Sequence, residues 1–446
     1  MSRKYMAGRA GGPGCDPGAF PSCRIGRLGA LLVVLLPVPV AARTMEMRFG
    51  DVVQIAGSDL PGLDGIPTER LAVLACDARA CHPIPFQVDE RDGGGQWVLD
   101  GGALASTDDP PGALDDNDAL LFMAADAGER VARARLPAAP HVYEARVQDP
   151  LSDTARWAYV LAGKAALAAN TGTYATYDPA TDRSRGARVS LSFADGVPQY
   201  LSVDDGPNLL DRLKIRASAT VLFGLLRFAR SEADLRTEVL GWRAGPIRVR
   251  RVQRQWVRLG WGIRSPAFVS HTLMCRDFAE LPVSLRLNFP ATFFFHDIRV
   301  RAVLDFRQLH GWQVLTEGLP QPLTVDGRMT AAKRALNRET GNWFALRGPD
   351  ITLLQVFESS ESLHAVRRRL VYREDADGVD PPEAVRGEHP GVGYQLDQWQ
   401  RVGAGRHQLT AISYALPADL DVREFVRTRQ APLAVSVQDL PPREGE

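Results

Sequence analysis

The sequence predicts an all-β protein: an N-terminal antiparallel β-sandwich, a larger antiparallel β-sandwich after it, and few short helices. Short runs rich in β-branched and aromatic residues alternate with polar residues along most of the chain, with the period of half-buried strands. Turn-forming Gly, Pro, Asp and Asn separate these runs at short intervals. Apolar residues make up 45% and charged residues 24% of the 446 residues, so the chain can bury a sizeable core.

Residues 1–42 are predicted to be a signal peptide. Basic residues lie near their start, an apolar run extends from Leu28 to Val40, and the small residues Ala41 and Ala42 follow. This is the order of a secretory signal and its cleavage site, and the proline-interrupted run is too short for a good membrane span. An uncleaved N-terminal anchor is the alternative. We therefore expect an exported protein, periplasmic or extracellular, that is not integral to a membrane after cleavage.

Charge and cysteine usage narrow the possible partners and the compartment. The chain has 53 basic and 53 acidic residues, and because basic residues prevail in 1–42 the remainder is slightly acidic. A general attraction to nucleic acid is not expected. Cys76 and Cys81 are predicted to form a disulfide in an oxidising compartment, with a metal site or two free thiols as alternatives. Cys275 is expected to be a buried thiol.

The N-terminal sandwich is assigned to residues 43–165. In the strand expected at 83–90, Ile84, Phe86 and Val88 would face the core and Gln87 would point outward. A returning strand is expected at 96–100, after the glycine-rich turn. The other expected strands lie in 47–57, 68–76, 119–126, 142–150 and 156–163.

The large β-sandwich is assigned to residues 166–437, and 438–446 to a disordered tail. A short helix capped by Asn208 is expected at 209–215, a buried strand at 219–229 and a second helix at 330–339. The clearest hairpin joins 235–242 to 247–264 through the turn at 243–246. Further strands are expected in 187–193, 282–289, 293–306, 312–319, 342–348, 351–359, 364–374, 393–399 and 407–416.

The segment CHPIPFQVDERD, followed by LDDNDALLFMAADAGERV, resembles the N-terminal module of a group of uncharacterised secreted bacterial β-sandwich proteins. That module has a Pro-x-Gln-x-Asp strand, an acidic turn and an Asp-Glu-Leu-x-Phe strand. Here Asn117, Asp118 and Ala119 replace the Asp-Glu pair. The large domain of the group resembles the β-supersandwich of mutarotase-like and polysaccharide-lyase-like proteins. The resemblance thus implies a supersandwich-like large domain and says little about activity.

The acidic loop of this module contains candidate metal ligands. Ca²⁺ prefers six to eight oxygen ligands, which Asp and Asn side chains supply. The loop lacks the twelve-residue spacing with an internal glycine and a final glutamate, and short Asp/Asn runs between strands more often form turns. The turn-forming interpretation is therefore favoured, and no other cofactor is expected. The candidate Ca²⁺ ligands are Asp89, Asp92, Asp115 and Asn117.

A strip of arginines and tryptophans is the predicted ligand-binding surface. Alternate residues of a strand share a face, so the even-numbered residues of 248–258 would form a cationic, aromatic strip able to hold the carboxylates or sulfates of an acidic glycan. The alternative is a solvent-exposed face whose arginines pair with acids of the strand at 235–240. The candidate ligand-binding residues are Arg248, Arg250, Trp256, Arg258 and Trp261, together with Arg299 if the strand at 293–306 pairs alongside.

Catalytic motifs for hydrolysis, metal-dependent proteolysis, nucleotide binding and dinucleotide binding are missing from the sequence. His271 and His296 are the candidate bases, because both would lie near the arginine strip if its neighbouring strands pair. The favoured function is a secreted envelope protein that binds carbohydrate or serves a structural role without catalysis. The alternative is a lyase or isomerase that acts on an acidic polysaccharide.

Overall fold

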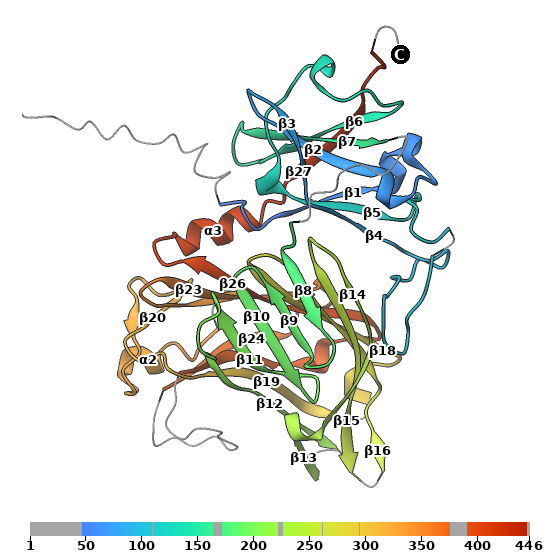
Figure 1. Cartoon of the computed structure of the whole chain (residues 1–446). Coiled ribbons are helices and arrows are strands. Elements are labelled where there is room, and N and C mark those ends of the chain that lie inside the picture. Colours follow the sequence, from blue (N-terminus) through green and yellow to red (C-terminus); the bar gives the residue numbers. More distant parts are fainter. Residues whose placement is uncertain are drawn as a thin grey trace, which may run out of the picture. The chain divides into compact units, whose positions relative to one another are not determined.

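The computed structural model describes residues 47–108, 110–163, 172–221, 226–260, 262–293, 295–339, 341–374 and 390–443. Within this part the strands form five sheets, every reported strand pairing is antiparallel, and two short α-helices accompany them (Figure 1). The predicted all-β class is confirmed. The predicted signal peptide lies outside the described residues. No helix in the described part has the length and hydrophobicity needed to cross a bilayer.

Two N-terminal sheets pack face to face around a shared core. Val53 and Phe122 from one sheet and Val73 and Val160 from the other belong to a single cluster of buried apolar side chains. The first sheet has the order β1 (Val52–Ala56), β5 (Ala119–Met123), β4 (Phe86–Asp89). The second has the order β27 (Ala434–Asp439), β6 (Val142–Gln148), β7 (Ala155–Ala162), β2 (Leu71–Cys76), β3 (Cys81–Ile84).

The C-terminal strand β27 completes the second N-terminal sheet, which the sequence did not indicate. It pairs with β6 over six residues and places Val435 opposite Val147. Helix α3 (Val422–Arg429), capped by the Asp421 carboxylate, precedes it. Gln438 and Asp439, expected in a disordered tail, are therefore strand residues. The predicted Cys76–Cys81 disulfide is present and joins β2 to β3, and Cys275 is a buried free thiol as expected.

Three further sheets form the large domain. A four-stranded sheet has the order β11 (Val197–Val203), β10 (Val189–Ala194), β9 (Arg183–Gly186), β8 (Ala175–Asp178). A five-stranded sheet has the order β13 (Leu226–Ser231), β12 (Leu210–Val221), β19 (His296–Phe306), β25 (Gly391–Asp397), β24 (Arg367–Arg373).

The ten-stranded sheet is the largest and provides the faces on which candidate sites lie. Its order is β14 (Leu235–Ala244), β15 (Val249–Gly260), β17 (Phe268–Met274), β18 (Phe278–Leu287), β26 (Gly405–Pro417), β23 (Ile351–Ser359), β22 (Trp343–Arg347), β20 (Gln313–Thr316), β21 (Leu323–Thr324), with β16 (Ile263–Arg264) paired to β15. The β14–β15 hairpin confirms the predicted one. Helix α2 (Ala331–Arg334) is shorter than the predicted helix at 330–339.

Three local predictions were wrong. Residues 209–215 are not a helix but the start of β12, and the Asn208 side chain accepts hydrogen bonds from the Leu201 and Leu210 amides instead of capping a helix. The expected buried strand at 219–229 contains the end of β12 and the start of β13, which pair as a hairpin. Residues 96–100 form no strand, because β4 pairs with β5 and only one isolated bridge joins Arg91 to Trp97.

Gln87 and Asp89 of strand β4 hold the turn of the β14–β15 hairpin. Gln87 was expected to point outward to solvent, but it is buried, and its Oε1 accepts the amides of Ile247 and Arg248 at 3.0 and 2.9 Å. Asp89 Oδ2 accepts from Arg248 Nε at 2.8 Å and also pairs with Nη2. A Cβ at Gly245 would lie 2.3 Å from the Gln87 amide, so this turn position needs glycine. We call Gln87, Asp89, Gly245 and Arg248 the hairpin clamp.

Asp89→Ala is expected to lower the free energy of unfolding by about 3 kcal/mol, because it leaves the Arg248 guanidinium without its buried counter-ion. Denaturant titration of residues 43–446 measures this loss. Glu238→Ala is the matched control, since it removes the exposed partner of Arg254 and is expected to cost less than about 1 kcal/mol. Equal losses in the two variants would contradict a stabilising clamp.

Candidate functional site

Strand β15 presents two different faces. Gln253 and Gln255 lie on the inner face, because both line the space between the ten-stranded and five-stranded sheets. Since side chains alternate along a strand, Arg250 and Arg254 lie on the outer face. Register places Val252 opposite His271 on β17, so His271 shares the outer face with Arg250. The sequence analysis therefore placed these even-numbered arginines on one face of the strand correctly.

Arg250 is a buried cation for which the described residues provide no hydrogen-bond acceptor. Its side chain is 8% exposed, and its guanidinium carbon lies 3.7 Å from the centre of the Trp97 ring. Arg91 stacks on the same indole at 3.6 Å. Among the described residues no carboxylate or carbonyl oxygen accepts a hydrogen bond from the Arg250 guanidinium. Burial, and secondarily the charge of Arg248, lower the pKa of Arg250 to about 10, so it remains protonated at neutral pH.

His271 lies beside Arg250 with one ring nitrogen unused. Its Nδ1 is buried and has no hydrogen-bond partner within the described part of the chain. Burial, assisted by the positive charge of Arg250, lowers the pKa of His271 to about 4. The imidazole is therefore neutral at pH 7. A neutral imidazole with a free nitrogen can accept a proton or a hydrogen bond.

Glu280 completes a row across three strands. Leu273 on β17 lies opposite Arg250 on one side and opposite Glu280 of β18 on the other. Strand spacing places the Arg250 and Glu280 backbones about 10 Å apart, with the half-buried Leu273 between them. Burial raises the pKa of Glu280, and the nearby Glu358 raises it further, while Arg248 and Arg250 act in the opposite direction. We call Trp97, Arg250, His271, Leu273 and Glu280 the Arg250 site.

The distal part of the predicted strip is a solvated face. Arg254 forms an exposed 2.6 Å ion pair with Glu238, an acid of the neighbouring strand β14. Arg258 is exposed and lies 4.0 Å from Asp234. Trp256 is half-buried, and Arg264 stacks on it at 5.7 Å. Trp261 lies outside the described residues.

His296 and Arg299 do not lie beside the arginines of β15. Both belong to β19, which pairs with β12 and β25 in the five-stranded sheet and has no pairing with β15 or β17. His296 is exposed at the start of the strand. Arg299 is exposed too, 3.8 Å from Asp397. The expectation that this strand pairs alongside the strip was wrong, because β14 and β17 occupy the two edges of β15.

The predicted metal ligands mainly form hydrogen bonds and ion pairs with nearby residues, and only Asp115 also belongs to a group of acids that could hold a cation. Asp89 belongs to the hairpin clamp, Asp92 accepts the amides of Gly94 and Gln96, and Asp115 accepts the Asn117 amide, so these side chains stabilise local structure. The acidic group that could hold a cation is instead Asp108, Asp115 and Asp118, whose nearest oxygens lie within 4.8 Å of one another.

Within this acidic group Asp118 is the most perturbed. It accepts the amides of Arg91 and Asp115, and burial raises its pKa to about 6. Asp108 was missed as a candidate because the proline-rich loop at 108–112 separates it from the other acids in sequence. Only the fold of that loop brings its carboxylate to them.

Comparisons with known proteins address the fold alone. No family model and no curated protein matches the chain. Among solved structures, the chain is similar to an α-mannosidase from Enterococcus faecalis V583, with a TM-score of 0.50 and 8% identity over 88% of this chain and 44% of the mannosidase. The chain thus spans less than half of that enzyme's length. At this identity the likeness supports the β-rich sandwich architecture and says nothing about the reaction.

Two other solved structures match more weakly. An α-N-acetylgalactosaminidase from Bifidobacterium bifidum has a TM-score of 0.34 at 15% identity, covering 59% of this chain and 38% of that one. A putative aldose 1-epimerase from Escherichia coli K12 has a TM-score of 0.32 at 8% identity, covering 54% and 98%.

His271→Gln is expected to reduce the decrease in the free energy of unfolding between pH ~7 and pH ~4. His271 is neutral in the folded protein down to pH ~4 but becomes protonated near pH 6.5 when unfolded, so it stabilises the fold above pH 6.5 and that stability is lost between the two values. The loss between pH ~7 and ~4 amounts to about 3 kcal/mol, because the two pKa values differ by about 2.5 units. Glu280 acts oppositely but is present in both proteins, so it cancels in the difference. Free energies of unfolding at pH ~7 and ~4 test this; parallel profiles would contradict a buried, neutral His271.

Proposed function

We propose that the chain is an exported protein that binds an anionic glycan at the Arg250 site. The observation that carries the proposal is Arg250, a residue that is only 8% exposed and whose guanidinium donates no hydrogen bond to the described residues. A buried cation without a partner is costly unless an anion meets it. A glycan carboxylate or sulfate would accept from its planar fork.

The rest of the Arg250 site suits a sugar ring. The Trp97 indole stacks on both the Arg250 and the Arg91 guanidinium, at 3.7 and 3.6 Å, so it holds the two cations in place and gives the site an apolar wall. The half-buried Leu273 lies between the cation and the Glu280 carboxylate, at a spacing of about 10 Å between the flanking backbones. Glu280 would accept hydrogen bonds from hydroxyl groups on the far side of the ring.

Export and carbohydrate specificity have independent support. The disulfide between Cys76 and Cys81 fits an oxidising compartment, and residues 1–42 have the pattern of a signal peptide. One solved structure with a similar fold is described as an α-mannosidase, and the proposal of a carbohydrate ligand is in keeping with this likeness of fold. The N-terminal module resembles that of secreted bacterial proteins with supersandwich domains, which we propose as the chain's relatives.

Arg250→Gln is expected to weaken binding of an acidic oligosaccharide about 10- to 100-fold, because one charge-assisted, bidentate contact is lost. A glycan array of residues 43–446 selects the ligand, and calorimetry of wild type and variant measures the change. Arg254→Gln is the matched control, since Arg254 lies on the same strand and face but is paired in solvent with Glu238. Absence of binding to every acidic glycan, or equal weakening by both variants, would contradict the proposal.

A second candidate function is β-elimination on a uronate-containing polysaccharide, and the neutral His271 beside Arg250 favours it. In this reaction the His271 imidazole takes the proton from the carbon next to the carboxylate held by Arg250. The released electron pair forms a carbon–carbon double bond as the adjacent C–O bond to the leaving sugar breaks. Water protonates that oxygen, and the imidazolium returns its proton to the resulting hydroxide. The product is an unsaturated uronate.

Under this second function, His271→Ala is expected to abolish formation of the unsaturated product while glycan binding stays within about threefold of wild type, because the carboxylate contact at Arg250 is kept. The ultraviolet absorbance of the product measures turnover. Binding of an acidic glycan by wild type without any absorbance change would leave the binding function and eliminate the lyase.

A further inference from the structure

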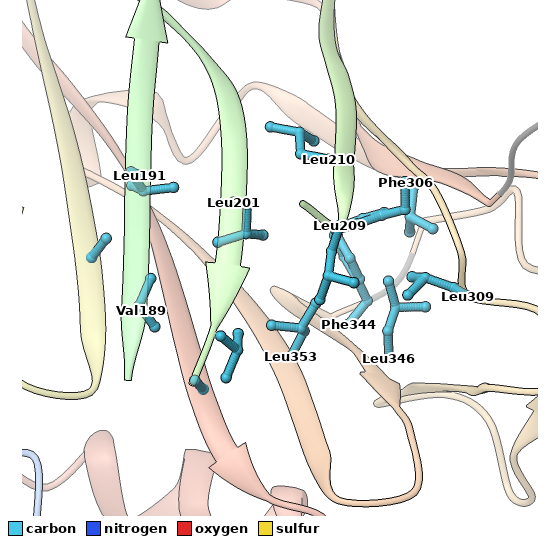
Figure 2. Close-up of a cluster of buried hydrophobic side chains, with 14 of the residues drawn as sticks. Val189, Leu191, Leu201, Leu209, Leu210, Phe306, Leu309, Phe344, Leu346 and Leu353 are labelled. Carbon is cyan, nitrogen blue, oxygen red and sulfur yellow. The ribbon is translucent and has the colours of Figure 1, made fainter. Parts of the chain in front are cut away.

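The space between the ten-stranded and five-stranded sheets is closed at one end by tight packing. There Val249 and Ala279 of one sheet and Leu210 and Phe306 of the other belong to one buried apolar cluster, to which the four-stranded sheet also contributes. All four side chains are at most 1% exposed. Figure 2 shows part of this cluster, with Leu210 and Phe306 among the labelled side chains next to Phe344 and Leu353. This end of the sandwich is an ordinary dry core.

At the other end of the same inner faces, the residues that the structure describes leave space between the sheets. Along β18, the buried Ala279 is followed on the same face by Leu281, Val283 and Leu285, which are all half-buried. Along β19, the buried Phe306 is preceded on the same face by Leu304 and Val300, half-buried, and by Ala302, exposed. Apolar side chains that point between two packed sheets are normally inaccessible to solvent. Here they border a cavity of about 480 Å³.

The cavity has a size and lining that suit a hydrocarbon chain. Its volume falls within the range of small-ligand sites, about 300–1,000 Å³. Valine, leucine, isoleucine, alanine and phenylalanine side chains of both sheets make up most of the wall. A sugar would lose many hydroxyl hydrogen bonds in such surroundings, whereas a methylene chain gains about 0.8 kcal/mol for each CH₂ buried.

Two buried donors without acceptors lie in the cavity wall. Gln355 and Tyr394 are each 6% exposed, and neither Gln355 Nε2 nor the Tyr394 hydroxyl has a hydrogen-bond partner in the described ranges. The Gln355 oxygen is already used by the Ser413 hydroxyl at 2.9 Å. Phe357 links the two donors, because it lies two residues from Gln355 on the same face and its ring contacts the Tyr394 ring at 5.4 Å.

A cation lies at the same place. Arg368 of β24 pairs in register with Leu396, a cavity-lining residue, so it faces the same side. Its guanidinium carbon lies 5.7 Å from the ring centres of both Tyr394 and Phe357. It donates to the Phe357 carbonyl at 3.3 Å, but its Nε is buried without a partner. Two neutral donors thus lie in the wall of the apolar cavity, and one positive charge lies next to the Tyr394 and Phe357 rings of that wall. The exposed Glu317 carboxylate also acts electrostatically on Tyr394, together with Arg368.

We propose that this cavity binds a fatty acid. The carboxylate accepts from Arg368, Tyr394 and Gln355, and the hydrocarbon chain lies along Val283, Leu285 and Val300 toward the unpacked end. The carboxylate satisfies the orphaned donors and neutralises the guanidinium, while the chain covers the half-buried apolar side chains. The cavity lies on the inner faces of the sheets and the Arg250 guanidinium on the outer face of β15, so the proposal does not depend on the glycan function; His271 belongs to the Arg250 site and also borders the cavity.

The test is displacement of the fluorescent fatty acid cis-parinaric acid from delipidated protein comprising residues 43–446. Palmitate is expected to displace the probe, octanoate to displace it much more weakly, and methyl palmitate to lie between them because it keeps the chain but loses the charge. Arg368→Gln is expected to weaken palmitate at least about tenfold, with little effect on methyl palmitate. Failure of cis-parinaric acid to bind, or of palmitate to displace it, would overturn the proposal.

Two further variants separate the site from general effects on the fold. Arg367→Gln is the matched control, because the neighbouring Arg367 is exposed and paired with Glu339 at 2.6 Å; it is expected to leave palmitate binding unchanged. Val283→Phe fills the cavity and is expected to weaken palmitate and methyl palmitate alike, with circular dichroism verifying the fold. Equal loss of palmitate in the Arg367 and Arg368 variants would contradict a specific carboxylate contact.

Discussion

The buried ion pair between Asp89 and Arg248 is the constraint on which the arrangement of the candidate surfaces depends. Neither charge is tolerable in its buried position without the other, and Gln87 adds two hydrogen bonds to the same hairpin turn. Together they hold the end of β4 against the start of β15. The loop that follows β4 carries Trp97, so the clamp also explains why an indole covers Arg250, only two residues beyond Arg248.

Arginines of the same strand and the same face therefore have different chemistry. Arg248 is neutralised by a buried carboxylate, Arg250 is desolvated without an acceptor, and Arg254 is paired in solvent. An exposed pair contributes little to stability or binding, whereas a buried unpaired guanidinium has a strong preference for an anion. Of the strip predicted from the sequence, only Arg250, next to His271 and Glu280, has a buried guanidinium without an acceptor among the described residues.

The two faces of the ten-stranded sheet suit ligands of opposite character. The outer face at the Arg250 site combines charge, an aromatic ring and a carboxylate, which suits a hydrated, anionic sugar. The inner face borders a mostly apolar cavity, because the facing sheet has the small side chains Ala217 and Ala302 where bulkier ones would fill the space. Near the closed end, Leu210 and Phe306 occupy the corresponding positions and exclude any ligand.

The sequence by itself determined the features that depend on local pattern. Alternation of apolar residues predicted the strands and the all-β class, turn chemistry predicted the β14–β15 hairpin, and cysteine spacing predicted the Cys76–Cys81 disulfide. Period-two spacing also placed Arg250 and Arg254 on one face correctly. These features need only a residue and its near neighbours in the chain.

Only the tertiary structure decided which strands lie side by side and which side chains lose their water. The separation of β19 from β15 removed His296 and Arg299 from the arginine strip, and the return of β27 to β6 tied the C-terminus to the N-terminal sheets. Asp108 joined the other acids, and Gln355, Arg368 and Tyr394 converged at the cavity, through long-range strand pairing. Pairing partners and burial are properties of contacts between residues far apart in the chain, and no local pattern of the sequence encodes them.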